Sequence, residues 1–340
     1  NIGLAGPLDR AEQVRAAFPQ PISNRDETKM TLVAMTGVTA MSRDFAAAMD
    51  ARGVLFPAEL IKDWFLTSDI VHISNEVSFW EDCPPQPTAN RGVFCSDPGY
   101  WELLKSINTR VIELTGNHLN DYGWEPLSYT LGIYESEGIP YFGGGRTLAD
   151  ATRYITLTHN GNVLAFAGCN PVGPAIGWVD GLNDGRPGSA PCASPFLTLQ
   201  EEISKAKSSG AVVFATLQYN EQPLGDYSYE TARSQANDFA RLVDAGADVV
   251  SGSQGHSVQG FGLKGNAFMH YGVGNLFFDQ TQAINLRQNF IDRYVVYDNR
   301  LISVELLATY RDGSQQTRPM TPAEKRALLK TLFELSYWEK

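Results

Sequence analysis

The chain has 340 residues, of which 43% are hydrophobic and 19% are charged, as in globular proteins with a large buried core. Its formal net charge of −11 argues against a nucleic-acid-binding protein, which needs a basic face for phosphate. The sequence has no run of Lys and Arg for an anionic membrane surface, and no apolar segment long enough to span a bilayer. We therefore expect no nucleic-acid partner and no transmembrane segment.

The first 29 residues are expected to form a leader ahead of one domain that spans residues 30–340. Apolar residues with helical spacing predict a helix over Asp9–Phe18, which Pro19 and Pro21 end. The sequence begins with Asn1 rather than with an initiator methionine. We therefore expect a mature or trimmed chain from which a targeting segment has been removed.

Short apolar runs in the first half predict buried strands, and longer runs with helical spacing predict helices between them. The strands are expected at Met30–Ala34, Ile70–Ser74, Ile139–Gly145 and in the run from Val111 that stops at Gly116. The helices are expected at Pro57–Phe65, Tyr100–Ile107 and Pro126–Glu137.

The second half continues the alternation and then changes to strands alone. An Asn-Gly turn predicts a hairpin of Tyr154–Leu157 and Val163–Gly168. Next come a helix at Phe196–Ser208, a strand at Ala211–Leu217, a helix at Tyr229–Ala245 and a strand at Asp248–Ser251. A β meander is expected at Ala267–Tyr271, Leu276–Asp279, Tyr294–Asp298 and Leu301–Tyr310, and a last helix at 321–337. This order predicts an α/β fold with a large mixed sheet.

Polar side chains follow several of the predicted strands at the point where each strand ends. These clusters are Val38–Thr39, Asn75–Glu76, Asn117–Asp121, Gln218–Glu221 and Gln254–His256. Open α/β sheets bind ligands in the crevice at the carboxyl ends of their strands. We therefore expect the five clusters to converge on one site.

The four cysteines are Cys83, Cys95, Cys169 and Cys192. None forms a Cys-x-x-Cys pair, which argues against a thiolate zinc site. Their even number and their places in predicted loops fit disulfides between Cys83 and Cys95 and between Cys169 and Cys192, and hence an oxidising compartment. Four free thiols in a cytoplasmic protein are the alternative, and we favour the disulfides.

Four ordered segments resemble the CapA, or poly-γ-glutamate capsule synthesis, family of the calcineurin-like metallophosphoesterase superfamily. They are 115–123 (TGNHLNDYG), 245–250 (AGADVV), 252–260 with its Gly-x-x-x-His-x-Val-Gln-Gly pattern, and 271–280 (YGVGNLFFDQ). The resemblance runs from about Met30 to Gln280. It implies a four-layer α/β/β/α sandwich with two metal ions at the sheet ends, where metals activate water and clamp a phosphoryl group.

The metal ligands that the resemblance implies are degenerate in this chain. Val38 stands where the family has an aspartate, Gln218 where it has a middle histidine, and Gln254 where it has the first histidine of a pair. We therefore predict no complete di-metal centre and no cofactor. Glu76, Asn117 and His256 would be the ligands of a single divalent cation, because Mg²⁺ and Ca²⁺ accept oxygen ligands.

We favour an enzyme, a secreted or periplasmic hydrolase of a surface polymer, either a polysaccharide or poly-γ-glutamate. Its acid–base groups would come from carboxylates and a His–Asp pair, as in glycosidases and other hydrolases. The expected catalytic residues are Glu76, His118, Asp121 and Glu221. The expected substrate-binding residues are Asn75, Asn117, Asn120, Gln218, Tyr219, Gln254, His256 and Trp124. A non-catalytic capsule assembly or export factor, a binding module with a dead site, and a single-metal phosphoesterase are the alternatives.

Structural roles are the competing interpretation of several of these residues. His118 could bond a neighbouring loop, Glu76 could pair with Arg91, and Asp121 could form an Asx turn with Gly123. Three histidines are expected to be structural: His72 and His270 inside strands and His159 in a turn. Asp279 is expected to fix a loop.

Overall fold

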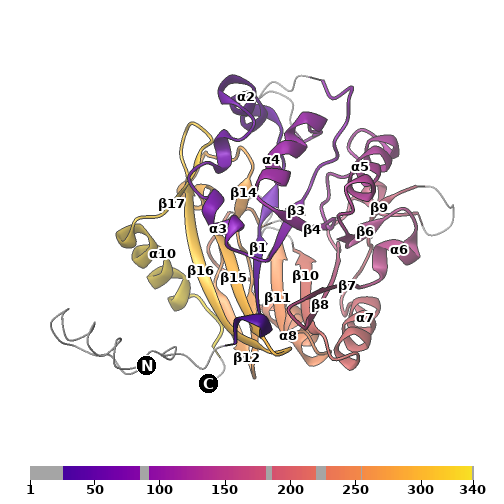
Figure 1. Ribbon diagram of the computed structural model, residues 1–340, viewed down its shortest axis with the longest axis vertical. Coiled ribbons are helices and arrows are strands. Elements are labelled where there is room, and N and C mark those ends of the chain that lie inside the picture. The colour runs from indigo at the N-terminus through magenta and orange to yellow at the C-terminus, as the bar shows by residue number, and fades with distance from the viewer. Residues whose placement is uncertain (1–25, 85–91, 181–185, 220–226, 254, 339–340) are drawn as a thin grey trace.

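The computed structural model describes residues 26–84, 92–180, 186–219, 227–253 and 255–338 (Figure 1). The helix predicted at Asp9–Phe18 and the candidate residues Arg91, Glu221 and Gln254 lie outside these ranges. The last residues of the predicted leader are described, and they pack on the domain. Asn160 donates its amide hydrogens to the carbonyls of Glu27 and Met30.

The first sheet has nine strands within the described residues. Its parallel part contains β1 (Met30–Thr36), β2 (Val38–Thr39), β3 (Ile70–Asn75), β4 (Thr109–Glu113), β5 (Tyr141–Phe142) and β14 (Asn275–Phe277). Its antiparallel part continues from β1 through β15 (Gln288–Tyr297), β16 (Leu301–Arg311) and β17 (Thr317–Pro319). Both β1 and β2 pair with β3, so the carboxyl end of β3 lies in the middle of the parallel part.

The second sheet has six strands in the described part of the chain. In spatial order they are β12 (Phe261–Lys264), β13 (Ala267–His270), β11 (Val249–Ser253), β10 (Val212–Gln218), β8 (Asn162–Cys169) and β7 (Ile155–His159). A short pair, β6 (Gly144–Gly145) with β9 (Gly188–Ser189), lies apart from both sheets.

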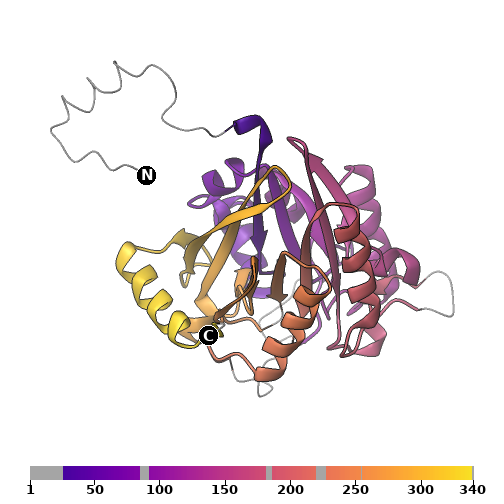
Figure 2. The same cartoon turned by 90° about the horizontal axis from the view of Figure 1, so that it is seen from below.

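Helices cover the outer face of each sheet, and the two inner faces pack on each other (Figures 1 and 2). The first sheet is covered by α2 (Arg43–Arg52), α3 (Lys62–Leu66), α4 (Trp101–Ser106) and α5 (Trp124–Ser136). The second is covered by α7 (Leu197–Ser208) and α8 (Arg233–Asp244), with the short α6 (Leu148–Thr152) beside them. A core of large apolar side chains, among them Phe166, Phe214 and Tyr294, fills the space between the sheets. The predicted four-layer α/β/β/α sandwich is confirmed.

The last helix, α10 (Pro322–Glu334), closes one side of the sandwich next to β16 and β17 (Figure 1). Its Leu328 and Leu332 join the core between the sheets. A capping box starts the helix, in which Thr321 accepts from the Glu324 N–H and Glu324 accepts from the Thr321 N–H. The one-turn helix α9 (Ile284–Arg287) precedes β15. No helix in the described residues has the length and apolar composition needed to cross a membrane.

Several elements differ from the sequence-based expectation. The predicted four-stranded meander is wrong, because β13 pairs in parallel with β11 in the second sheet and β14 pairs in parallel with β2 in the first. Each of these strands therefore belongs to a different sheet, and in the described part of the last third only β15, β16 and β17 form a meander. The sequence pattern also missed α2 and β12, whose apolar periodicity is weak.

Three predicted elements are shorter or divided. The strand expected at Ile139–Gly145 is split into β5 and β6 at Gly143, whose φ of +71° turns the chain away from the sheet. The helix expected at Pro57–Phe65 is a 3₁₀ turn at Phe56–Ala58 followed by α3. The helix expected from Tyr229 begins at Arg233, because Tyr229 instead donates its hydroxyl to Gln288 on β15.

Both predicted disulfides are present. Cys83 pairs with Cys95 at a Cα–Cα distance of 5.8 Å, and Cys169 pairs with Cys192 at 6.0 Å. The first closes the loop after β3, and the second ties the end of β8 to the segment before α7. The alternative of four free thiols does not hold in this structure.

Two buried polar contacts hold strands together inside the sandwich. Nδ1 of His270 on β13 lies 2.5 Å from a carboxylate oxygen of Asp292 on β15, and Tyr294 donates its hydroxyl to the same oxygen at 3.2 Å. In the first sheet, Nε2 of His72 lies 3.1 Å from a carboxylate oxygen of Glu113. The structural roles expected for His72 and His270 agree with these contacts. We call the contact of His270, Asp292 and Tyr294 the inter-sheet clamp.

The inter-sheet clamp should contribute strongly to stability. A His270→Leu substitution would leave the Asp292 carboxylate buried without its imidazole partner, which we expect to lower the free energy of unfolding by about 3 kcal/mol. Urea unfolding followed by circular dichroism measures the change. His159→Leu is the matched control, since His159 is a third exposed and lies 3.7 Å from Asp69, so its loss should cost about 1 kcal/mol or less. Equal losses in the two variants would contradict a special role for the clamp.

Candidate functional site

The candidate site lies where β3 and β4 end side by side. A Cβ atom at Gly116 would lie 2.6 Å from Cα of Glu76, so only glycine allows the two strand ends to come this close. Beyond the glycine, Val77 and His118 form a parallel β-bridge. This approach brings the buried Glu76 carboxylate within electrostatic reach of the His118 imidazole, at the strand-end edge that we call the crevice.

His118 and Asp121 form a hydrogen-bonded pair at the edge of this crevice. Nδ1 of His118 lies 2.7 Å from a carboxylate oxygen of Asp121, and the same oxygen accepts the backbone N–H of Phe94 at 2.7 Å. Burial lowers the pKa of His118, but the bond to Asp121 and the charges of Glu76 and Asp121 outweigh burial and raise that pKa above its ordinary value. Since Asp121 holds Nδ1, the Nε2 atom is free to exchange a proton with a ligand.

Arg43 contributes a cation to the site that the sequence analysis missed. Its guanidinium stacks on the rings of Phe94 at 4.6 Å and Phe278 at 5.0 Å, and it forms a two-pronged ion pair with Asp279. Asp279 therefore does more than fix its own loop, because it anchors Arg43 from across the crevice. No local motif marks Arg43, which is the first residue of α2, and its φ of +51° is visible only in the structure.

His256 enters the same crevice from the loop after β11. It is buried, and its Nδ1 lies 2.8 Å from Oδ1 of Asn275. Burial, together with the positive charge of nearby His118 and Arg43, lowers the pKa of His256 to about 4, although the bond to Asn275 opposes this effect. His256 is therefore neutral near pH 7, and its ring packs on Phe278 with a centroid distance of 5.4 Å.

The two amides of the site bond to each other. Nε2 of Gln218 at the end of β10 donates to Oδ1 of Asn117 at 3.1 Å. Asn117 follows β4 in the first sheet, so this bond joins the carboxyl ends of the two sheets. The predicted convergence of the strand-end clusters is observed for Glu76, Asn117, His118, Asp121, Gln218 and His256.

Three positions of the metal-ligand set that the resemblance implies carry other residues here, namely Val38, Gln218 and Gln254. The Asn117 oxygen that would face a metal accepts a hydrogen from Gln218, and Val38 offers no donor atom. Among the described residues, no group of three or more His, Cys, Asp or Glu side chains is placed to hold a metal ion. A single cation would have to be held by Glu76, Asn117 and His256.

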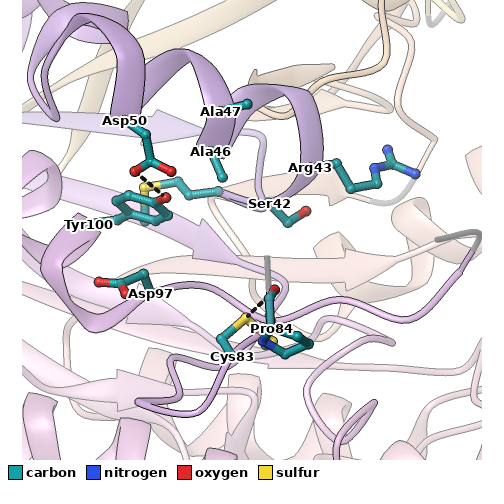
Figure 3. Close-up of a pocket in the computed structure, with 11 residues that line it drawn as sticks. Ser42, Arg43, Ala46, Ala47, Asp50, Cys83, Pro84, Asp97 and Tyr100 are labelled. Carbon is teal, nitrogen blue, oxygen red and sulfur yellow. Dashed lines mark hydrogen bonds between the residues drawn. A yellow bond between two sulfur atoms is a disulfide. The ribbon is translucent and has the colours of Figure 1, made fainter. Parts of the chain in front are cut away.

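Arg43 separates two pockets next to the crevice. One pocket of about 590 Å³ lies under α2 and is lined by Asp50, Asp97, Tyr100 and the Cys83–Cys95 disulfide. Figure 3 shows Tyr100 hydrogen-bonded to Asp50 on one side of this pocket and Arg43 extending from the start of α2 at its end. The other pocket, of about 400 Å³, is lined by Arg43, Tyr227, Asp279 and Gln280.

Four candidate residues are not brought to the crevice. Asn75 is buried and donates to the Val77 carbonyl and the Tyr134 hydroxyl, so its side chain bonds toward α5 and not to a substrate. The ring of Tyr219 faces α8, where its hydroxyl bonds to Asp238. Asn120 and Trp124 line a separate pocket on the other side of the His118 loop. The sequence could not separate these residues from the rest, because strand-end position alone does not say which way a side chain points.

The comparison with protein families matches residues 32–280 to the model of "Bacterial capsule synthesis protein PGA_cap". This match covers well over half of the chain, and it confirms the resemblance drawn from the four sequence segments.

Relatives with curated names agree with this match. The chain is 24% identical over 334 residues to "Capsule biosynthesis protein CapA" of Bacillus anthracis, covering 94% of this chain and 78% of that protein. It is 28% identical over 180 residues to "PGA biosynthesis protein CapA" of Bacillus subtilis (strain 168), covering 53% of this chain and 45% of that protein. Among solved structures, Haemophilus influenzae NAD nucleotidase matches with a TM-score of 0.47 and 12% identity, covering 92% of this chain and 64% of that chain.

The contact between His118 and Asp121 predicts a measurable shift. Nuclear magnetic resonance of ¹³C-labelled histidine would follow the titration of the five imidazoles. We expect the pKa of His118 to lie above the ordinary value for histidine, and Asp121→Asn to lower it because both a charge and a strong acceptor are lost. His118→Gln assigns the signal, and an unchanged His118 titration in Asp121→Asn would disprove the coupling.

The buried neutral His256 predicts a loss of stability in acid. Its pKa is about 4 in the folded chain and ordinary in the unfolded chain, so the unfolded chain binds more protons between about pH 6.5 and pH 4. The free energy of unfolding should therefore fall as the pH falls through this window, by up to about 3 kcal/mol from this group. Urea unfolding at both ends of the window should show a smaller fall for His256→Asn, which tolerates the left-handed backbone at this position. An identical fall in wild type and variant would contradict this assignment.

Proposed function

The chain belongs to the PGA_cap family of bacterial capsule synthesis proteins, and on that premise we propose that it is an extracytoplasmic hydrolase of a surface polymer, a polysaccharide or poly-γ-glutamate. The observation that carries the proposal is the His118–Asp121 pair beside the Glu76 carboxylate at the ends of β3 and β4. A proton donor and a proton acceptor at one strand-end crevice suit hydrolysis by general acid–base chemistry.

The proposed reaction uses His118 as the acid and Glu76 as the base. A substrate bond lies between them, with its leaving atom near Nε2 of His118. Glu76 takes a proton from water as the water oxygen attacks the substrate carbon, and His118 gives its proton to the leaving atom as the old bond breaks. The raised pKa of His118 favours the protonated form that this step needs. Asp121 keeps the imidazole in place and stabilises its positive charge.

The remaining residues of the crevice have supporting roles in this proposal. Arg43, held by Asp279 and two aromatic rings, would bind a negative or polar group of the substrate next to the reacting bond. Asn117, Gln218 and the neutral His256 would bond to substrate oxygens. Glu221 and Gln254 keep their predicted roles as a catalytic carboxylate and a substrate-binding amide.

The two disulfides support a location outside the cytoplasm. Structural disulfides persist in oxidising compartments and are rare in reducing ones. The Cys83–Cys95 bridge lines the pocket next to Arg43, so it would hold one side of the site in place where a polymer outside the cell could reach it.

A non-catalytic role in capsule polymer assembly or export is the second candidate. It is favoured by the names of relatives, which refer to capsule and PGA biosynthesis and not to polymer cleavage. The single-cation phosphoesterase is a further alternative, in which Glu76, Asn117 and His256 would hold one hard ion.

The acid–base proposal predicts which substitutions abolish polymer cleavage. Purified protein would be incubated with capsular polysaccharides and with poly-γ-glutamate, and new reducing ends or new amino groups would be measured. We expect Glu76→Gln and His118→Ala to lower the rate by about 100-fold or more, since each removes one proton-transfer group. A rate that survives both substitutions would rule out these two residues as the acid and the base.

Matched controls and a chelator separate the three candidates. Glu305→Gln and His159→Gln replace the same residue types on the surface and should leave the rate unchanged. A rate that is lost with EDTA and restored by Mg²⁺ or Ca²⁺ would favour the single-cation alternative. Binding of a polymer without any cleavage by wild type would favour the assembly factor.

A further inference from the structure

The pocket lined by Asn120 and Trp124 lies beside the His118 loop and takes no part in the proposed proton transfers. Its volume is about 540 Å³, and it is formed by the loop after β4, the start of α5 and the segment between β8 and α7. Its walls are largely apolar. We call it the tryptophan pocket, and the lining residues that matter to its chemistry are Asn120, Trp124, Ile176, Trp178, Asp180 and Arg186.

Large apolar side chains are exposed at this pocket. Trp124 is 42% exposed although it begins a helix that packs on the core, and Ile176 is 77% exposed. The guanidinium of Arg186 lies over the Trp124 ring at 4.9 Å from the centroid. Exposed aromatic faces with a polar neighbour are the usual means of binding rings that are apolar on one face and polar at their edges.

Two polar atoms under the walls lack hydrogen-bond partners among the described residues. Asn120 is 7% exposed, and its amide hydrogens go to the carbonyls of Ile176 at 3.2 Å and Pro187 at 2.8 Å. These bonds fix the amide, so Oδ1 remains as an acceptor without a donor. The indole N–H of Trp178 is a donor without an acceptor. Buried polar groups are rarely left in this state, and a ligand with hydroxyls, or water carried with it, would supply both partners.

The described part of the wall around Trp178 is closely packed. Trp178 forms a β-bridge with Ser189, and a Cβ at Gly188 would lie 2.4 Å from the Trp178 carbonyl carbon, so this segment is packed backbone on backbone. The Cys169–Cys192 disulfide ties the two ends of the segment together. A wall that is already ordered loses little conformational entropy when it binds a ligand.

The tryptophan pocket adjoins the loop that carries His118, on the side away from the candidate active site. Asn120 follows His118 by two residues, and a Cβ at Gly177 would lie 3.4 Å from the carbonyl oxygen of Asn117. The same loop therefore presents His118 to the crevice and Asn120 to the pocket.

We propose that the tryptophan pocket is a binding subsite for a sugar ring, so that the substrate is a glycan and not poly-γ-glutamate. Its link to catalysis rests on the function proposed above, but sugar binding itself does not. A pyranose offers C–H faces to the tryptophan rings and hydroxyls to the Asn120 oxygen and the Trp178 N–H. Poly-γ-glutamate offers one carboxylate per unit, whereas Arg186, the one cation among the described residues that line the pocket, lies 3.8 Å from the Asp180 carboxylate. The net charge of −11 also disfavours long-range attraction of a polyanion to the protein.

Affinity electrophoresis tests the subsite without any need for catalysis. Wild type, Trp124→Ala and Trp124→Phe would be run through gels that contain laminarin, mannan, xyloglucan, polygalacturonate or poly-γ-glutamate. We expect at least one polysaccharide to retard wild type, with binding about tenfold weaker in Trp124→Ala and largely kept in Trp124→Phe. Trp338→Ala is the matched control, because Trp338 is 40% exposed after α10, and it should bind as wild type does.

The outcomes separate this inference from the proposed function. Retardation by poly-γ-glutamate alone, or equal binding by wild type and Trp124→Ala, would overturn the sugar subsite even if a polymer is cut. Sugar binding that depends on Trp124, in a protein that cuts no polymer, would support the subsite and overturn the hydrolase. Glu305→Gln should bind the polysaccharide as wild type does, since Glu305 is exposed and pairs with Arg293 away from both sites.

Discussion

The candidate site depends on one close approach between two strand ends. Gly116 lies against the backbone of Glu76 so tightly that a methyl group would not fit between them. Because β3 and β4 are parallel neighbours, both leave the sheet at the same edge, and this contact keeps their following loops together. The positions of His118, Asp121 and the tryptophan pocket all follow from the path that the chain takes after Gly116. The lack of a side chain at Gly116 thus allows the arrangement of the loops that follow β3 and β4.

Hydrogen bonds between neutral groups occupy the place where the family resemblance implies metal ions. Gln218 bonds to Asn117 across the two sheets, and His256 bonds to Asn275. These bonds join the carboxyl ends of the two sheets. The charges that remain, on Glu76, Asp121 and Arg43, lie around His118 and set its pKa. The scaffold is therefore compatible with proton transfer even though its ligand set is degenerate.

The sequence predicted the layers and the grouping of several strand-end residues, and it failed where side-chain direction or long-range pairing decides the outcome. Buried β-branched runs and the ordered family segments indicated the sandwich, and loop cysteines indicated both disulfides. Arg43 was missed because its partners, Phe94, Phe278 and Asp279, are distant in sequence and meet only after folding. Asn75 was wrongly assigned to substrate binding. It precedes Glu76, and successive side chains of an extended chain point to opposite faces. Likewise, the strands β13 and β14 look like one meander in sequence but belong to different sheets.

The two disulfides keep the segments that they close covalently attached even when one peptide bond in them is cut. Each closes a covalent ring, with 12 residues of sequence separation between Cys83 and Cys95 and 23 between Cys169 and Cys192. A protease that cuts one peptide bond within either ring leaves both new ends attached to the molecule. Exposed loops are the usual points of proteolytic nicking. Such a cut therefore leaves both parts of the segment within one covalent molecule.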